Sequence, residues 1–161
     1  MIEINWLALL AAAVSTFIVG FIWYNPKVFG TAWMNETGMT EEKAKGANMA
    51  LIFGMALVFA FMLSIVLQMN VIHQFGAQSA AEGIKGVDPS VLQNYFDAYG
   101  NTYRTFGHGA LHGLVFGIFV ALPILGTNAL FEMKSWKYIF INAGYWMVNL
   151  MLMGGIICAW K

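Results

Sequence analysis

The chain has 161 residues, of which 60% are apolar and only 10% are charged, and its mean hydropathy is +0.67. Soluble domains carry roughly 25% charged residues, so this composition excludes a water-soluble fold of the same size. Its eight basic and eight acidic residues cancel, which removes the basic patch typical of nucleic-acid-binding proteins. We therefore expect an integral membrane protein whose surroundings are membrane lipids, with no nucleic-acid partner.

Four apolar stretches are each long enough to cross a bilayer as a helix. A hydrocarbon core of about 30 Å requires about 20 helical residues, and each stretch has that length with almost no charge inside it. The sequence predicts an all-α fold, a polytopic membrane protein whose residues 1–161 form one four-helix transmembrane domain. The predicted spans are residues 4–24, 47–69, 106–125 and 138–160.

The first span carries aromatic residues at both ends, as expected where a helix meets the two membrane interfaces. Trp6 lies near its start, and Trp23 and Tyr24 lie near its end. No Lys or Arg precedes it, so we interpret it as a retained helix and not as a cleaved signal peptide. The span stops before Pro26, and Thr40 is the candidate N-cap of the helix that leads into the second span.

The connection over residues 70–105 is polar enough to lie outside the membrane and contains one predicted helix. Asp88 is its candidate N-cap, and Pro89 suits the first helical position. Apolar and aromatic residues then share one face before Gly100, which predicts a short amphipathic helix at the membrane interface. That face consists of Val91, Leu92, Tyr95, Phe96 and Tyr99.

Positive charges in the connections indicate the orientation, because cytoplasmic loops carry an excess of Lys and Arg. The first and third connections hold Lys27, Lys43, Lys45, Lys134 and Lys137. The termini and the middle connection hold Lys85, Arg104 and Lys161. We therefore expect a multi-pass protein of the inner cell membrane with both termini and the connection over residues 70–105 outside the cell membrane.

The third span contains a stripe of small residues spaced four apart, namely Gly109, Gly113, Gly117 and Ala121. Lipid provides no hydrophobic force between helices, so close van der Waals contact between small residues takes its place. We expect this face to be packed against another helix. A weaker stripe in the first span makes these two helices candidate neighbours.

Amide and phenol groups in the fourth span should point into the bundle, because polar groups in hydrocarbon require partners. Asn142, Tyr145 and Asn149 share one face of that span. Hydrogen bonding between helices is one interpretation of these residues. The other is a polar pocket, lined by these three residues and His112, that binds or transports a small molecule.

The three histidines of the chain are candidate metal ligands. His108 and His112 are one helical turn apart, and His73 follows the second span on the same side of the membrane, so all three rings could converge. Asp97 is a candidate fourth ligand. However, the histidine pair lacks the Glu of a zinc-protease motif, and interfacial histidines often contact only backbone and water. The sequence therefore assigns no metal and no other cofactor, and keeps the histidines as candidates.

The sequence contains no arrangement of residues typical of an enzyme. The hydroxyl and thiol groups of Ser15, Thr16, Ser64 and Cys158 lie within the spans, without a neighbouring His and carboxylate to activate them. No Gly-rich loop with a Lys is present to bind phosphate. We name no catalytic residue and expect a protein that is not an enzyme.

Short segments spread along nearly the whole chain form a recognisable pattern. They are Asn5-Trp6, Gly20, Trp23-Tyr24, Pro26, Phe29-Gly30, Trp33, Leu130-Phe131-Glu132, Trp136, Ile141-Asn142-Ala143-Gly144-Tyr145 and Met153-Gly154. This pattern resembles the small bacterial and fungal membrane proteins of domain-of-unknown-function family 1761. The resemblance implies four transmembrane helices, with no established activity or ligand. Residues 70–105 and the His108 and His112 pair depart from the family's pattern, so a histidine site is not implied for the whole family.

These observations leave three functions open. We expect a non-enzymatic protein that acts through helix–helix assembly, either as a homo-oligomer or as an accessory subunit of another membrane protein complex. The alternative is a small-molecule or ion transporter or binder with a polar pocket between the helices. The third is a metal or haem site at the outer interface, which depends on the histidines alone.

Overall fold

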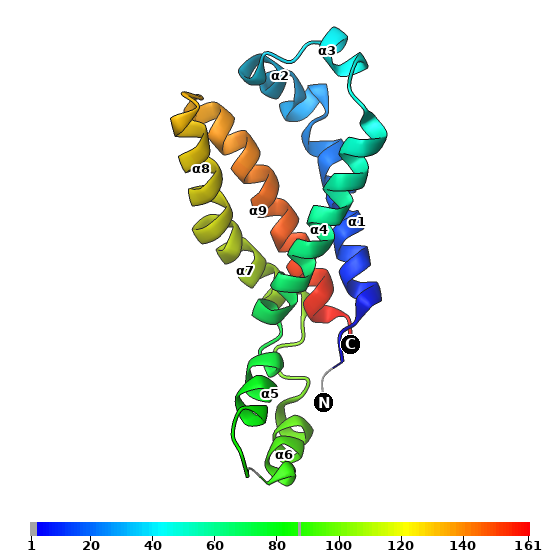
Figure 1. Ribbon diagram of the computed structural model, residues 1–161, viewed down its shortest axis with the longest axis vertical. Helices are drawn as coiled ribbons and strands as arrows, with labels where there is room; N and C mark the ends of the chain where they lie inside the picture. Colours follow the sequence, from blue (N-terminus) through cyan, green and yellow to red (C-terminus); the bar gives the residue numbers. More distant parts are fainter. Residues whose placement is uncertain (1–2, 87) are drawn as a thin grey trace.

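The computed structural model describes residues 3–86 and 88–161, and four long helices pack side by side within them (Figure 1). They are α1 (Trp6–Trp23), α4 (Met49–Val71), the continuous run Phe106–Phe131 and α9 (Trp136–Ala159), each long and apolar enough to cross a membrane. No strand occurs in the described ranges. The expectation of an all-α, polytopic membrane protein with four candidate spans is confirmed.

Shorter helices connect the four long ones. The run Phe106–Phe131 itself comprises α7 (Phe106–Phe116), the π-helical turn η2 (Gly117–Ala121) and α8 (Leu122–Phe131). It therefore continues six residues beyond the predicted limit at residue 125. The remaining elements are the π-helical turn η1 (Pro26–Gly30), α2 (Thr31–Thr37), α3 (Glu41–Lys45), α5 (Gln74–Glu82) and α6 (Pro89–Tyr99).

A polar side chain begins each of the four long helices. In every case its side-chain oxygen accepts a hydrogen bond from the amide three residues further on, which satisfies one of the unpaired donors of the first helical turn. These N-caps are Asn5, Asn48, Thr105 and Ser135.

Helix α9 lies at the centre of the bundle, where α1, α4 and α7 all contact it. The glycine face of α7 lies directly on it: a Cβ atom at Gly109 would overlap the Gly154 carbonyl oxygen, and one at Gly113 would overlap that of Leu150. The principal partner of both α1 and α7 is thus α9, although the stripes of small residues suggested that the first and third spans contact each other.

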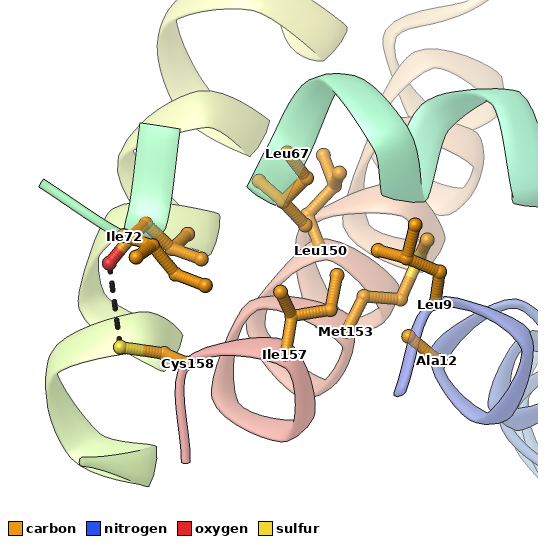
Figure 2. Close-up of a cluster of buried hydrophobic side chains, with 9 residues drawn as sticks. Leu9, Ala12, Leu67, Ile72, Leu150, Met153, Ile157 and Cys158 are labelled. Carbon is orange, nitrogen blue, oxygen red and sulfur yellow. Dashed lines mark hydrogen bonds between the residues drawn. The ribbon is translucent and has the colours of Figure 1, made fainter. Parts of the chain in front are cut away.

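The tightest packing is found in the half of the bundle where the chain ends. Leu9 of α1, Leu67 of α4, and Leu150, Met153 and Ile157 of α9 are almost completely buried there (Figure 2). We call this end of the bundle, at which Trp6 and Ala159 lie, the terminal end. It connects directly to the middle segment of the chain.

That middle segment forms a helical hairpin, in which α5 and α6 contact each other and project beyond the terminal end (Figure 1). Helix α6 begins as predicted, with the Asp88 carboxylate accepting a hydrogen bond from the Ser90 amide. Helix α5 was not predicted, because its Gln, Ala and Ser residues give no clear apolar periodicity. The hairpin places its base, at His73 and Tyr103, beside the first turns of α7.

Candidate metal centre

Three imidazole rings meet at the base of the hairpin. His73 Nε2 lies 2.9 Å from His108 Nε2 and 3.3 Å from His112 Nε2. One potential ligand atom from each of the three residues lies within 4.8 Å of the other two. The His73 side chain is exposed, whereas the other two are partly buried, so the cluster is open to its surroundings on the His73 side.

Two separate segments supply these rings. Helix α4 ends at Val71, Ile72 is extended with φ −109° and ψ 94°, and His73 then precedes α5. His108 and His112 lie in the first two turns of α7, and their spacing of four residues places both rings on the same face. The centre therefore joins the end of one predicted span to the start of the next.

The thiol of Cys158 in α9 holds these two segments together. Its Sγ atom lies 3.3 Å from the carbonyl oxygen of Val71 and 3.3 Å from that of Tyr103. A dashed line in Figure 2 marks a hydrogen bond of Cys158. The single S–H proton is shared between these two acceptors, one just before His73 and one just before α7. Arg104 fixes the same corner, because its Nε donates to the Cys158 carbonyl oxygen at 2.8 Å and its Nη2 donates to that of Trp160 at 2.6 Å.

Tyr103 adopts a backbone conformation that bulky residues rarely use. Its φ of 63° lies in the left-handed region, where a side chain other than that of Gly is strained. In this conformation its ring stacks on His108, with 4.9 Å between ring centroids and 20° between ring planes. Such strain is found preferentially where a fold positions a functional group.

Hydrogen bonds among the three rings do not satisfy all the ring nitrogens that meet in this cluster. In a neutral imidazole, each ring nitrogen offers either one proton or one lone pair. His73 Nε2 faces two other Nε2 atoms and therefore cannot form a full hydrogen bond with both. A metal ion bound at about 2.0–2.1 Å by three tetrahedrally arranged nitrogens separates them by about 3.3 Å, close to the observed distances.

The set of potential ligands consists of histidines only. Asp97, the candidate fourth ligand, instead accepts a hydrogen bond of 2.8 Å from Gln93 in its own helix and takes no part in the cluster. The two distances from His73 are also too short for a haem iron to lie between His73 and either of the other histidines.

The comparison with known families finds a match over most of the chain. Residues 7–158 match the family described as "Protein of unknown function (DUF1761)". The chain belongs to this family. No curated protein and no solved structure matches the chain. Membership of DUF1761 thus confirms the resemblance noted from the sequence, and it assigns no ligand.

In this DUF1761 chain the other predicted polar residues form a separate network, towards the opposite end of the bundle. The hydroxyl of Tyr24 donates to the Asn142 amide oxygen at 3.3 Å, and that of Tyr145 donates to the Thr16 carbonyl oxygen at 3.3 Å. The fully buried Asn149 donates to the Tyr145 carbonyl oxygen at 2.9 Å. His112 does not join these residues, because it lies in the histidine cluster.

Two hollows of the described structure have walls that do not include Asn142, Tyr145 or Asn149. One, of about 310 Å³, is apolar and lies between α4 and the η2, α8 and α9 segments. The other, of about 290 Å³, adjoins the histidine cluster and is lined by His73, Gln74, Tyr95, Tyr99, Thr102 and Tyr103. Sequence reasoning found the histidines through their spacing, but it assigned no function to Gln74 or to the tyrosines.

Proposed function

We propose that this protein binds a divalent transition-metal ion, with Zn²⁺ as the reference ion, through the Nε2 atoms of His73, His108 and His112. One observation carries the proposal: three ring nitrogens from two different segments converge within 4.8 Å. The chain has only these three histidines, and chance gives no reason for all of them to meet at one point.

The ligand chemistry selects the class of ion. Imidazole suits Zn²⁺, Cu²⁺ and Ni²⁺, whereas Ca²⁺ and Mg²⁺ require oxygen ligands. No carboxylate belongs to the cluster that the described residues form. Three neutral ligands leave the charge of the ion uncompensated and leave one position open, as in zinc sites that exchange a ligand.

The location of the centre supports capture of the ion from outside the cell. The charge distribution in the connections favours an inner-membrane protein with its termini and its hairpin outside, and the centre lies at the base of that hairpin. On this orientation the exposed His73 ring faces the external medium. Binding, and not catalysis, is the role proposed for the centre.

Helix–helix assembly was the function expected from the stripe of small residues on the third span. Within this chain, however, the glycines of that stripe lie against α9. They therefore give no support to contact with a second copy or with another subunit. The metal centre is the function better supported by the geometry.

Zinc titration of the purified full chain in detergent tests the proposal. Isothermal calorimetry and elemental analysis should give one Zn²⁺ per chain. The separate substitutions His73→Ala, His108→Ala and His112→Ala should each remove that stoichiometric binding. Asp97→Asn is the matched control, because it alters a potential ligand outside the cluster and should leave affinity unchanged. Absence of stoichiometric Zn²⁺ binding by the unsubstituted chain, or unchanged Zn²⁺ binding in all three histidine variants, would overturn the proposal.

A further inference from the structure

The hollow of about 290 Å³ beside the histidines, which we call the tyrosine pocket, has the character of a ligand site. Its walls are His73, Gln74, Tyr95, Tyr99, Thr102 and Tyr103. We infer that it binds a small aromatic alcohol, of the phenol or hydroquinone class, whose oxygen coordinates the metal ion held by the histidines. The inference rests on the proposed function and names the ligand that occupies the open position of the ion.

The pocket and the metal centre share a wall. His73 belongs to both, and the ring of Tyr103, a second wall residue, lies 6.1 Å from the His73 ring and stacks on His108. Three protein ligands leave a fourth tetrahedral position for an external atom. A molecule in the pocket therefore lies within reach of that position.

The shape and the surface of the pocket favour a flat ring. Tyr95 and Tyr99 lie 5.5 Å apart between ring centroids, within the range in which aromatic rings attract one another, and both line the pocket. A cavity of about 150 Å³ is sufficient for benzene. The measured volume of about 290 Å³ therefore admits one substituted ring.

The residues that line the pocket indicate which polar group its ligand carries. None of the six residues that line the pocket is charged, so no Lys or Arg is available there to bind a phosphate or a second carboxylate oxygen. An organic cation would be repelled by the metal ion. A phenol enters uncharged: its O–H bond then breaks, the oxygen lone pair binds the ion, and the proton leaves to water, as metal-bound water itself ionises.

Gln74 belongs to the wall of the pocket and follows His73 directly in the chain. Its Nε2 donates two hydrogen bonds of 2.9 Å, to the carbonyl oxygens of Tyr99 and Thr102, and so ties α5 to the end of α6. Because both partners are acceptors, the side-chain nitrogen must face them, and Oε1 must point elsewhere. That oxygen is buried and does not face the hollow, so Gln74 contributes to the pocket by joining the two helices that form it.

Cobalt substitution tests the inference, because the visible spectrum of Co²⁺ reports a change in its ligands. The full chain in detergent is first loaded with Co²⁺, and binding is measured through that spectrum. Phenol is then titrated, with cyclohexanol as the non-aromatic alcohol and anisole as the ring without an ionisable hydroxyl. We expect a saturable spectral change with phenol alone. Tyr95→Leu should weaken phenol binding by about two- to tenfold at unchanged Co²⁺ affinity, and Tyr138→Leu, the same substitution far from the pocket, should not.

The two possible failures are distinguishable. If Co²⁺ does not bind, or binds independently of the histidines, the proposed function fails and the inference fails with it. If Co²⁺ binds through the histidines but phenol leaves its spectrum unchanged, the metal centre stands and the aromatic-alcohol site is overturned. Equal spectral responses to phenol, cyclohexanol and anisole would also overturn the aromatic-alcohol site. So would phenol binding by Tyr95→Leu that equals that of the unsubstituted chain.

Discussion

Two polar clusters lie towards opposite ends of the bundle, and they differ in the partners of their polar groups. In the network of Tyr24, Asn142 and Tyr145, each hydroxyl has a hydrogen-bond acceptor within the chain. In the histidine cluster, the only hydrogen bonds that the ring nitrogens make among the described residues are with one another. On the proposed function, this contrast separates polar groups that hold helices together, whose hydroxyls have an acceptor within the chain, from groups that bind a ligand, which face their own kind.

The largest expected effect comes from forcing α7, which carries two of the histidines, away from α9, which carries Asn142 and Tyr145. Gly113→Ile would drive a side chain into the Leu150 backbone and should destabilise the fold by more than about 3 kcal/mol. Thermal unfolding and size-exclusion profiles in detergent measure this loss. Gly107→Ile is the control, because a Cβ there meets nothing within 4 Å. Equal behaviour of the two variants would show that α7 does not pack as described.

One variant from each cluster, measured for both Zn²⁺ affinity and stability, sharpens the contrast between the clusters. His112→Ala should lower Zn²⁺ affinity by at least about 100-fold, since loss of even an outer partner of a metal ligand costs 10- to 100-fold. Asn142→Ala should instead lower the unfolding free energy by about 1 kcal/mol and leave Zn²⁺ affinity unchanged. Calorimetric titration and thermal unfolding of both variants give the four values. A loss of Zn²⁺ affinity in Asn142→Ala equal to that in His112→Ala would erase the distinction.

Acidification should weaken Zn²⁺ binding by the histidines while the hydrogen bond that begins helix α6 persists. Metal binds only imidazole nitrogens that carry no proton, so protons compete with the ion and Zn²⁺ affinity should fall from pH 7.5 to 5.5. The helix α6 cap should persist, because hydrogen bonds from Ser90 hold the pKa of the Asp88 carboxyl below its ordinary value and keep it charged in this range. Titrations at stepped pH, with circular dichroism as the check on folding, measure both. A flat affinity profile would argue against histidine ligands.

The smallest effect concerns the thiol that joins the two segments of the metal centre. Cys158→Ala removes the donor shared by the Val71 and Tyr103 carbonyl oxygens and should weaken Zn²⁺ binding about two- to tenfold, the equivalent of one hydrogen bond. Cys158→Ser retains a donor and should stay within about twofold of the natural chain. If Ala and Ser behave alike, the thiol fills space at this corner and does not position the ligands.

The sequence was sufficient for the number and type of the long helices, because length and hydropathy alone determine which segments can cross a bilayer. The ends of the helices were harder to predict from the sequence. The third helix continues to Phe131, but Gly126, Thr127 and Asn128 lower the apolar signal before that point. Helix α5 was not predicted for a related reason, because a polar helix outside the membrane has no apolar stripe in its sequence.

Half of the metal centre is visible in the sequence, and half requires the folded chain. The spacing of His108 and His112 fixes two rings on one helix face, and the topology brings His73 to the same end of the bundle. Nothing in the sequence indicates that Cys158 contacts both segments, or that Tyr103 adopts a positive φ, because both depend on how α9 packs. The same limit applies to the glycine stripe, whose partner is chosen among several helices that all offer small residues.

X-ray absorption at the zinc edge of the loaded full chain identifies the atoms that bind the ion. We expect three imidazole nitrogens at about 2.0–2.1 Å and one further light ligand. A sulfur atom at about 2.3 Å would place the ion at Cys158, and a shell of oxygen alone would place it on carboxylates. Either result would contradict a centre built from His73, His108 and His112.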